Sequence, residues 1–374
     1  MTPLSGLKVI ELARILAGPW AGQLLADMGA EVIKVEAPEG DDTRTWGPPF
    51  VEHSGERSAA YFHGCNRGKK SVVIDFSNED GKAALMRLLA DADVLIENFK
   101  VGGLAKYGLD YASLQTTHPR LIYCSITGFG QDGPYSLRAG YDYIIQGMSG
   151  LMSVTGDPDG QPQKVGVAVT DIFTGLYASN AILAAVHQRH STGSGQHIDL
   201  ALLDVAVATT ANQAMNYLAT GKSPERLGNS HPNIVPYQVF ECSNGHVIIA
   251  VGNDNQFRKF CSILDLHMLG VDPRFANNPK RLENRATLVP LLAEKMLEWT
   301  KADILLTCES KGVPAGPINT FEDVFADPQV IARGLKLDID GVLSVRPPMR
   351  FSNADLELNR PAPLLGQDQD IIGE

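Results

Sequence analysis

Cysteine is scarce in this sequence, and the residues present form no recognisable pattern. The 374-residue chain has 5 cysteines, an odd number, and none stands in a C-x-x-C pair. A disulfide framework or a cysteine-based zinc site is therefore not indicated. This cysteine usage is typical of a protein that works in a reducing compartment. The cysteines are Cys65, Cys124, Cys242, Cys261 and Cys308.

Positive charge and long apolar runs are also lacking. The chain has 32 Lys and Arg against 43 Asp and Glu, and the net charge of −11 argues against nucleic-acid or anionic-membrane partners. A local basic pocket for a small phosphorylated ligand is compatible with this balance. The N-terminus has no basic region followed by an apolar core, and no run reaches the ~18 apolar residues of a membrane span. We therefore expect a soluble, cytoplasmic protein with no membrane partner.

Three motifs that identify common enzyme classes are missing. Glu36 stands where dehydrogenases place a ribose-binding acid. A dinucleotide-binding turn also needs three glycines, however, and the turn at residues 13–19 has one, so no NAD is expected. The 9 histidines show no H-E-x-x-H or similar spacing, so no metal is expected. The absence of a G-x-S-x-G motif gives serine hydrolase chemistry no support.

The sequence does contain a repeated βαβ pattern. Residues 7–12 predict a strand, a helix follows to about Met28, and residues 31–35 predict a second strand. The predicted fold class is α/β, with a Rossmann-like, doubly wound parallel sheet in a large domain. The pattern continues with predicted strands at residues 71–76, 94–96 and 121–126 and a predicted helix at residues 80–90.

The length of the chain indicates two domains, because a single hydrophobic core usually stops growing below this size. Residues 1–198 form the large domain in this interpretation. Residues 199–225 are rich in Ala and Leu at their start and predict a linker helix, and residues 226–318 predict a smaller α+β domain. A further helix is expected from Asp171 to about His187, and its apolar residues on nearly every side indicate that it is buried.

The loops after the predicted strands are expected to form a ligand site. Ligands bind at the carboxyl ends of parallel strands, so residues 14–18, 97–99 and 127–133 should face one crevice. Asn98 and Phe99 with Lys106 suit a nucleotide, because adenine needs an apolar face and polar edge contacts while phosphates need cations. Each basic residue near these loops is, taken alone, more commonly a solvated surface charge. These basic residues are Arg67, Lys69, Lys70, Lys100, Lys106 and Arg138.

Asp171 stands where an extended segment meets the apolar helix. The commonest role of an aspartate at such a position is to cap the helix. The same geometry also suits a nucleophile, because backbone N–H groups and the helix dipole would keep the carboxylate ionised while its exposed oxygen attacks an electrophile. The two roles are compatible.

Three segments carry a more specific combination of motifs. Residues 9–36 contain V-I-E-L, L-A-G-P and G-A-E-V-I-K-V-E, residues 94–99 read V-L-I-E-N-F, and residues 166–196 contain G-V-A-V-T-D and T-G-S-G-Q. Together they resemble the class III coenzyme A-transferases (CaiB/BaiF family), which include formyl-CoA transferase and carnitine CoA-transferase. The resemblance covers the whole chain, including G-V-P-A-G-P at residues 312–317 and A-P-L-L-G at residues 362–366.

The resemblance implies transfer of coenzyme A from an acyl-CoA to a carboxylic acid, with Asp171 as the nucleophile and aspartyl anhydride and aspartyl-CoA intermediates. It also implies a homodimer of two interlocked chains, in which residues 319–374 return to the large domain. Ala37 and Ser77 replace two basic residues of formyl-CoA transferase, so Arg14, Lys106 or Arg138 would bind the phosphates. The CoA site implied by the resemblance comprises Ile15, Leu16, Ala17, Ile74, Asn98, Phe99, Gly103, Lys106, Tyr107 and Arg138.

The α-methylacyl-CoA racemases share this fold and the aspartate, and they are the alternative. Where a racemase has a histidine after the glycine-bearing loop, this chain has Tyr141, and where it has a glutamate at the start of the small domain, this chain has Gln238. Without an imidazole to pair with Asp171, movement of an α-proton lacks its second acid–base group. Transfer is therefore favoured, with Tyr141, Asp142 and Gln238 expected at the substrate.

Two segments suggest the class of substrate. G-D-D-T-R-T-W-G-P-P-F at residues 40–50 and Y-C-S-I-T-G at residues 123–128 resemble the succinyl-CoA-dependent dicarboxylate transferases of the family. Arg44 could hold the distal carboxylate of a dicarboxylate. It could equally be a surface ion-pair partner, which is the commoner role of an isolated arginine.

Overall fold

The computed structural model describes residues 1–373, and the chain divides into two compact units. Unit 1 comprises Met1–Leu151, Lys164–Lys222 and the residues from Pro328 onward. Unit 2 comprises Met152–Gln163 and Ser223–Asp327. Unit 1 is thus built from three separate stretches of the sequence.

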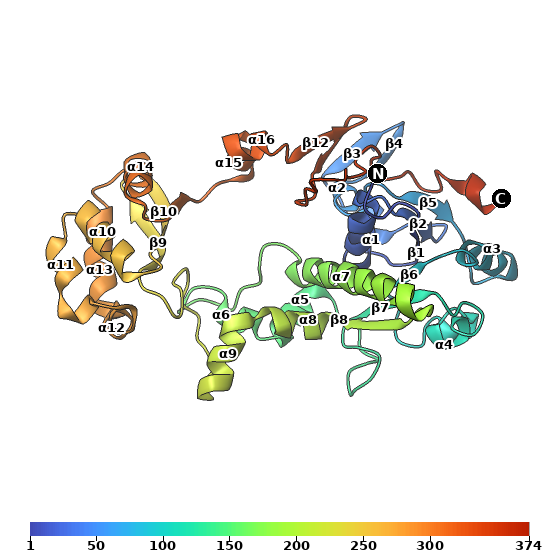
Figure 1. The fold of residues 1–374 in the computed structure, drawn as a ribbon, viewed down its shortest axis with the longest axis horizontal. Helices are drawn as coiled ribbons and strands as arrows, with labels where there is room; N and C mark the ends of the chain where they lie inside the picture. Colours follow the sequence, from blue (N-terminus) through green and yellow to red (C-terminus); the bar gives the residue numbers. More distant parts are fainter. Residues whose placement is uncertain (374) are drawn as a thin grey trace. The chain divides into compact units, whose positions relative to one another are not determined.

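A six-stranded parallel sheet forms the centre of unit 1 (Figure 1). Its strand order is β5-β2-β1-β6-β7-β8, and all neighbouring strands run parallel. Because the chain winds outward on both sides of the β1/β6 junction, the sheet is doubly wound. The predicted Rossmann-like α/β architecture is confirmed. The strands are β1 (Lys8–Glu11), β2 (Glu31–Glu36), β5 (Lys70–Val73), β6 (Val94–Glu97), β7 (Ile122–Thr127) and β8 (His197–Ala201).

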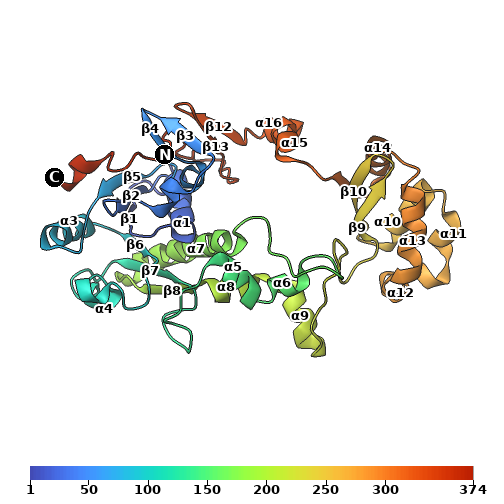
Figure 2. The same cartoon turned by 180° about the vertical axis from the view of Figure 1, so that it is seen from behind.

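The alternation of side chains along the strands determines which helices cover each face of the sheet. Val9 of β1 packs in one core with residues of α1 (Ala17–Asp27) and α7 (Val169–Thr192). Its neighbour Ile10 points the other way and packs with residues of α3 (Glu79–Leu89) and α4 (Tyr111–Leu114). Figures 1 and 2 show α1 and α7 side by side from both directions.

The last stretch of the chain is attached to the edge of this sheet. The Asp368 carboxylate accepts the Ser71 N–H at 2.9 Å, and the Gln369 side chain accepts the Val73 N–H at 2.8 Å. These bonds satisfy backbone donors of β5, which is the outermost strand on that side. The other elements of unit 1 are β3 (Phe50–His53), β4 (Glu56–Ala59), α2 (Ala60–His63), α5 (Asp142–Met148), α8 (Leu202–Thr209), α9 (Ala211–Thr220), α16 (Pro328–Ala332), β12 (Lys336–Ile339) and β13 (Val342–Val345).

Unit 2 contains a three-stranded antiparallel sheet with the order β11-β10-β9. Val247 and Ile249 of β10 are buried, whereas Ile248 between them is exposed, so one face of the sheet packs against helices. The helix α6 (Leu151–Val154) spans the boundary between the units. The other elements are β9 (Tyr237–Cys242), β10 (Gly245–Ala250), α10 (Asp254–Ile263), α11 (His267–Val271), α12 (Asn278–Glu283), α13 (Arg285–Met296), α14 (Lys301–Lys311), β11 (Ala315–Pro317) and α15 (Phe321–Ala326).

The prediction that residues 199–225 form one linker helix is wrong. The first residues form β8, which pairs with β7, and two helices follow. The break between α8 and α9 lies at Ala211, whose φ of 44° is incompatible with a continuous right-handed helix. The alternating residues of β8 were hidden in the sequence by the Ala- and Leu-rich stretch directly after them.

The prediction that α7 is buried on nearly every side is also wrong. Phe173, Leu176 and Tyr177 are exposed in the single chain, while Ala178 and Ile182 pack in the core. By length and composition alone this helix could also cross a membrane. Its packing against α1 and the sheet accounts for its apolar composition as that of a core helix.

Candidate active site

A cavity of about 480 Å³ lies at the carboxyl ends of β1, β6 and β7. This is the junction at which the winding of the sheet reverses, and ligands of doubly wound folds bind there. The structure brings most of the predicted site residues together around this one space. Those that line it are Ile15, Leu16, Ala17, Asn98, Phe99, Gly103, Lys106, Arg138, Tyr141 and Asp171.

Asp171 is the third residue of α7, which begins at Val169. The expectation that Asp171 caps this helix is wrong, because the chain becomes helical two residues earlier. The cap is supplied by Asp142, whose carboxylate accepts the Thr170 N–H at 2.8 Å, the Thr170 hydroxyl at 2.5 Å and the Asp171 N–H at 3.4 Å. Asp142 therefore satisfies the first donors of α7, and the side chain of Asp171 lines the cavity instead.

A glycine in α7 determines how closely this helix approaches α1. A Cβ atom at Gly175 would lie 2.7 Å from the Ala17 carbonyl oxygen and 2.9 Å from Trp20 Cβ, so no larger residue fits without separating the helices. Gly175 follows Asp171 by about one helical turn. This close contact therefore brings the start of α7 against the first turn of α1, and both Asp171 and Ala17 line the cavity.

The environment of Asp171 makes its carboxylate basic. Burial, followed by the negative charge of Asp142, raises the pKa of Asp171 to about 7. The sequence had suggested that helix N–H groups and the helix dipole would keep this carboxylate ionised, and burial outweighs that effect. At neutral pH a large share of the group is still ionised, and a carboxylate with a raised pKa is a stronger base and nucleophile.

The sequence matches the model of CoA-transferase family III over residues 4–369. The chain belongs to this family. It is 58% identical to "Succinate--glutarate CoA-transferase" of Agrobacterium fabrum, in an alignment that covers 98% of this chain and 94% of that protein. It is 45% identical to "Succinyl-CoA:glutarate CoA-transferase" of Homo sapiens, with 98% and 84% covered.

A solved structure supports the same assignment. The crystal structure of a CaiB/BaiF family protein from Brucella suis matches with a TM-score of 0.91 and 60% sequence identity, over 100% of this chain and 98% of that chain. This chain is therefore a CoA-transferase, which moves coenzyme A between an acyl-CoA and a carboxylic acid, as the motifs predicted. Acyl-CoA is the substrate of the family. Within residues 1–373, no group of three or more His, Cys, Asp or Glu side chains is arranged to hold a metal ion.

The cavity of this CoA-transferase has a basic lining, although the whole chain carries a net charge of −11. Two of the basic side chains are held by neighbours at the surface. Arg14 pairs with Asp42 at 3.0 Å, and the Arg138 guanidinium lies 3.9 Å from the centre of the Tyr135 ring. Both contacts leave the guanidinium groups within reach of solvent, where a phosphate can approach. The basic residues of the lining are Arg14, Lys100, Lys106 and Arg138.

Three other basic residues that the sequence placed near the crevice do not line it. Lys70 on β5 pairs with Glu31 at 2.5 Å and is partly exposed, whereas the other two are buried. The Arg67 guanidinium is buried and pairs with Asp27 at 2.7 Å, and the Lys69 ammonium is buried and pairs with Glu11 at 2.8 Å. The sequence does not reveal the ion pairs of Arg67 and Lys69, because Asp27 and Glu11 lie far away along the chain. Arg67 and Lys69 are therefore not candidates for binding the phosphates of CoA.

Arg44 does not line the cavity either. Its guanidinium donates to both carboxylate oxygens of Glu36, at 2.7 and 2.8 Å, and to the carbonyl oxygen of Pro363 at 3.2 Å. It also lies 3.7 Å from the centre of the Phe62 ring. In the single chain Arg44 therefore has the ion-pair role that the sequence analysis offered as one of two alternatives. The structure gives no support for binding of a substrate carboxylate by Arg44.

Four more of the predicted residues lie outside the cavity lining. Ile74 is buried in the hydrophobic core next to β5, and the Tyr107 ring packs against Phe76. Asp142 is engaged at the start of α7 as described above. Gln238 lies on β9 in unit 2, where its side-chain oxygen accepts the Ser230 hydroxyl at 3.4 Å.

Tyr61 in α2 is a candidate that the sequence did not indicate. Burial raises the pKa of Tyr61 to about 12, and the negative charge of Asp171 is the next largest cause. The phenol stays protonated at neutral pH and can donate a hydrogen bond. No motif around Tyr61 distinguishes it in the sequence, because its burial and the charges that act on it arise only in the fold.

Proposed function

We propose that this enzyme transfers coenzyme A from succinyl-CoA to a dicarboxylate of the glutarate type, with Asp171 as the nucleophile. The observation that carries this proposal is that the Asp171 carboxylate and a set of basic side chains line one cavity. A cavity with a basic rim suits the phosphates of CoA, and a basic carboxylate beside it suits attack on the thioester. The names of the two relatives above support the choice of succinyl-CoA and glutarate.

The first half of the reaction loads coenzyme A onto the enzyme. An oxygen of the Asp171 carboxylate attacks the thioester carbonyl of the donor and expels the CoA thiolate, which gives a mixed anhydride. The thiolate then attacks the aspartyl carbonyl, and the donor leaves as a free carboxylate. The resulting aspartyl-CoA thioester retains the energy of the original thioester, which a stable serine ester would not.

The second half reverses these steps with the acceptor. The acceptor carboxylate attacks the aspartyl carbonyl and expels the CoA thiolate, which forms a second anhydride. The thiolate attacks the acceptor carbonyl of this anhydride and releases Asp171 as a carboxylate. The N–H groups of Ala17 and Gly18 have no partner within α1, and they suit the oxyanions that form beside Ala17. Water has to be excluded, because every intermediate is hydrolysable.

We also propose that the enzyme acts in the cytoplasm as a homodimer of interlocked chains. Large apolar side chains are exposed on α5, α7 and α9 of the single chain, among them Tyr143, Phe173 and Leu218 at 60%, 37% and 71% exposure. A monomer would leave these side chains in water at a cost, so burial against a second copy supports the dimer.

The direct test is a transfer assay with the purified chain. Succinyl-CoA and glutarate should give glutaryl-CoA and free succinate in equal amounts, and Asp171→Asn should reduce kcat by about 1000-fold or more because the nucleophile is lost. No transfer with any dicarboxylate, combined with deuterium exchange at the α-carbon of a 2-methylacyl-CoA, would instead support the racemase alternative.

A further inference from the structure

Ile15 adopts a backbone conformation that is unfavourable for its residue type. Its φ is 71°, in the left-handed region that glycine enters freely and that β-branched residues rarely adopt. Ile15 also lines the cavity, directly before the first turn of α1. A strained conformation at a ligand site persists only where the surrounding structure holds it.

Side chains from distant parts of the sequence hold the two residues before Ile15. The Lys34 ammonium donates to the Ala13 carbonyl oxygen at 2.9 Å. The Asn98 amide engages both backbone groups of Arg14, accepting its N–H at 2.9 Å and donating to its carbonyl oxygen at 2.7 Å. The Asn98 amide expected at an adenine is thus already committed to the backbone of the neighbouring loop.

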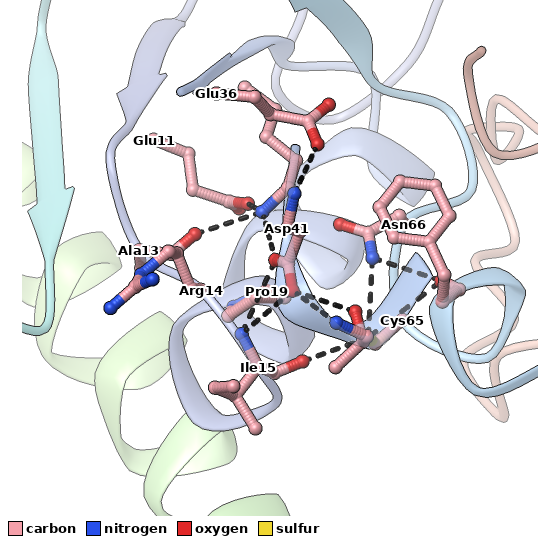
Figure 3. A network of polar contacts seen from close by, with 12 residues as sticks. Glu11, Ala13, Arg14, Ile15, Pro19, Glu36, Asp41, Cys65 and Asn66 are labelled. Carbon is pink, nitrogen blue, oxygen red and sulfur yellow. Dashed lines mark hydrogen bonds and ion pairs between the residues drawn. The ribbon is translucent and has the colours of Figure 1, made fainter. Parts of the chain in front are cut away.

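The strained residue itself is held by Asp41 (Figure 3). The Ile15 N–H points at the Asp41 carboxylate, at 3.3 and 3.4 Å from its two oxygens. The carbonyl oxygen of Ile15 accepts the Cys65 thiol at 3.5 Å. Asp41 is the only ionised group among these two partners, because burial raises the pKa of Cys65 to about 12.

Asp41 is itself fixed on all sides. It is 1% exposed, its carboxylate pairs with the Lys34 ammonium at 2.9 Å, and it accepts the Thr43 N–H at 3.0 Å. Its own N–H donates to the Glu36 carboxylate at 2.9 Å. Burial opposes ionisation, but the charge of Lys34 and these hydrogen bonds lower the pKa of Asp41, so it stays charged.

We propose that Asp41 is a positioning residue for acyl-CoA: its buried carboxylate holds Ile15 in the left-handed conformation and so directs residues 14–17 into the cavity. Asp41 does not line the cavity and acts only through the backbone of Ile15. The inference rests on the proposed binding of acyl-CoA in this cavity. A merely structural role would lower stability without a specific effect on CoA affinity, and the two roles are separable.

The test is a double-mutant cycle that uses glycine at residue 15. Asp41→Asn should raise the Kd for CoA, measured by calorimetry, and the KM for succinyl-CoA by about 10-fold, with kcat changed less than about 3-fold. In an Ile15→Gly background the same Asp41→Asn change should raise both constants less than about 3-fold, because glycine adopts positive φ without help. Equal effects in the two backgrounds, or a loss of kcat alone, would overturn the proposal.

A matched control separates this role from helix capping in general. Asp41 caps the short 3-10 helix Asp42–Thr45 through the Thr43 N–H. Asp272 caps another short 3-10 helix, Pro273–Phe275 in unit 2, by accepting the Arg274 N–H at 2.8 Å. Asp272→Asn should leave the Kd and KM unchanged. An equal rise of KM in Asp272→Asn would contradict a specific role of Asp41.

A second variant keeps the proposal testable if Asp41→Asn does not fold. Ile15→Pro removes the N–H of residue 15 and forbids positive φ, while it leaves the buried charges intact. Ile15→Val keeps the N–H and can still adopt the same φ as the native isoleucine. We expect Ile15→Pro to bind CoA about 10-fold more weakly than Ile15→Val at a similar Tm. Equal affinity of the two variants would overturn the proposal. Calorimetry with CoA also distinguishes this outcome from failure of the proposed function, because it needs no turnover.

Discussion

At the scale of single residues, the proposed chemistry depends on two neighbouring carboxylates with different tasks. Asp142 binds the first N–H groups of α7, whereas Asp171 faces the cavity. The negative charge of Asp142 adds to the effect of burial on Asp171, and a pKa of about 7 for Asp171 follows. The nucleophile is therefore titrated within the physiological range, and its ionised fraction rises with pH.

The pH dependence of turnover should report this titration. We expect kcat/KM for succinyl-CoA to rise with pH to a plateau, with a midpoint near the Asp171 pKa of about 7. Asp142→Asn removes the neighbouring negative charge, so the midpoint should move to lower pH. Asp80→Asn, in the first turn of the exposed end of α3, is the control and should leave the midpoint unchanged. The same midpoint in all three proteins would contradict the coupling between Asp142 and Asp171.

The raised pKa of Asp171 also predicts a cost in stability. The folded chain prefers the protonated carboxyl, so stability from this group is present at low pH and is lost as pH rises through about 7. The free energy of unfolding of Asp171→Asn, relative to that of the native chain, should therefore rise by about 2 kcal/mol from pH 5 to pH 8. Urea unfolding at the two pH values measures this difference. A constant difference between the two proteins would show that Asp171 has an ordinary pKa.

At the scale of secondary-structure elements, the contact between α1 and α7 sets the geometry of the site. The contact is close because Gly175 has no side chain. It brings the first turns of both helices to one cavity, which Asp171 and residues 14–17 line together.

Gly175→Ala tests this contact. Alanine is the better helix former by about 1 kcal/mol, yet its Cβ would overlap the Ala17 carbonyl oxygen and push the helices apart. We expect a net loss of about 1–3 kcal/mol in the free energy of unfolding and a fall in kcat of about 10-fold or more. Ala184→Gly, at an exposed position on the same helix, should cost about 1 kcal/mol and retain kcat. If Gly175→Ala is more stable and fully active, the helices are not held by this contact.

The sequence predicts these elements better than it predicts their local contacts. The repeated strand–helix–strand pattern is enough to predict the doubly wound sheet, because each strand and helix is recognised from its own local residue pattern. The conformation of Ile15 could not be predicted, since it depends on Asp41 and on the Arg14 contacts of Asn98, far away in the sequence. The contact of Arg44 with the Pro363 carbonyl oxygen, 319 residues further along the chain, could not be predicted for the same reason.

At the scale of the whole molecule, large apolar side chains are exposed on several helices of the single chain. They include Ile144 on α5, Tyr177 on α7 and Met215 on α9, with exposures of 50%, 45% and 60%. Their burial against a second copy would remove a large apolar surface from water.

The mass of the protein in solution tests this expectation. Analytical ultracentrifugation at micromolar concentration should give twice the chain mass of 40.4 kDa. Leu218→Glu, which places a charge on the exposed apolar surface of α9, should weaken the dimer. A native chain that sediments as a monomer over the working range of concentrations would contradict the proposed assembly.

The central claim is that Asp171 carries the covalent intermediates, and mass spectrometry tests it most directly. The native enzyme, incubated with succinyl-CoA and trapped with hydroxylamine, should yield a hydroxamate at the side chain of Asp171 in the peptide that contains it. Asp171→Asn should yield none under the same conditions. A modified residue other than Asp171, or no adduct in an enzyme that turns over, would contradict the account.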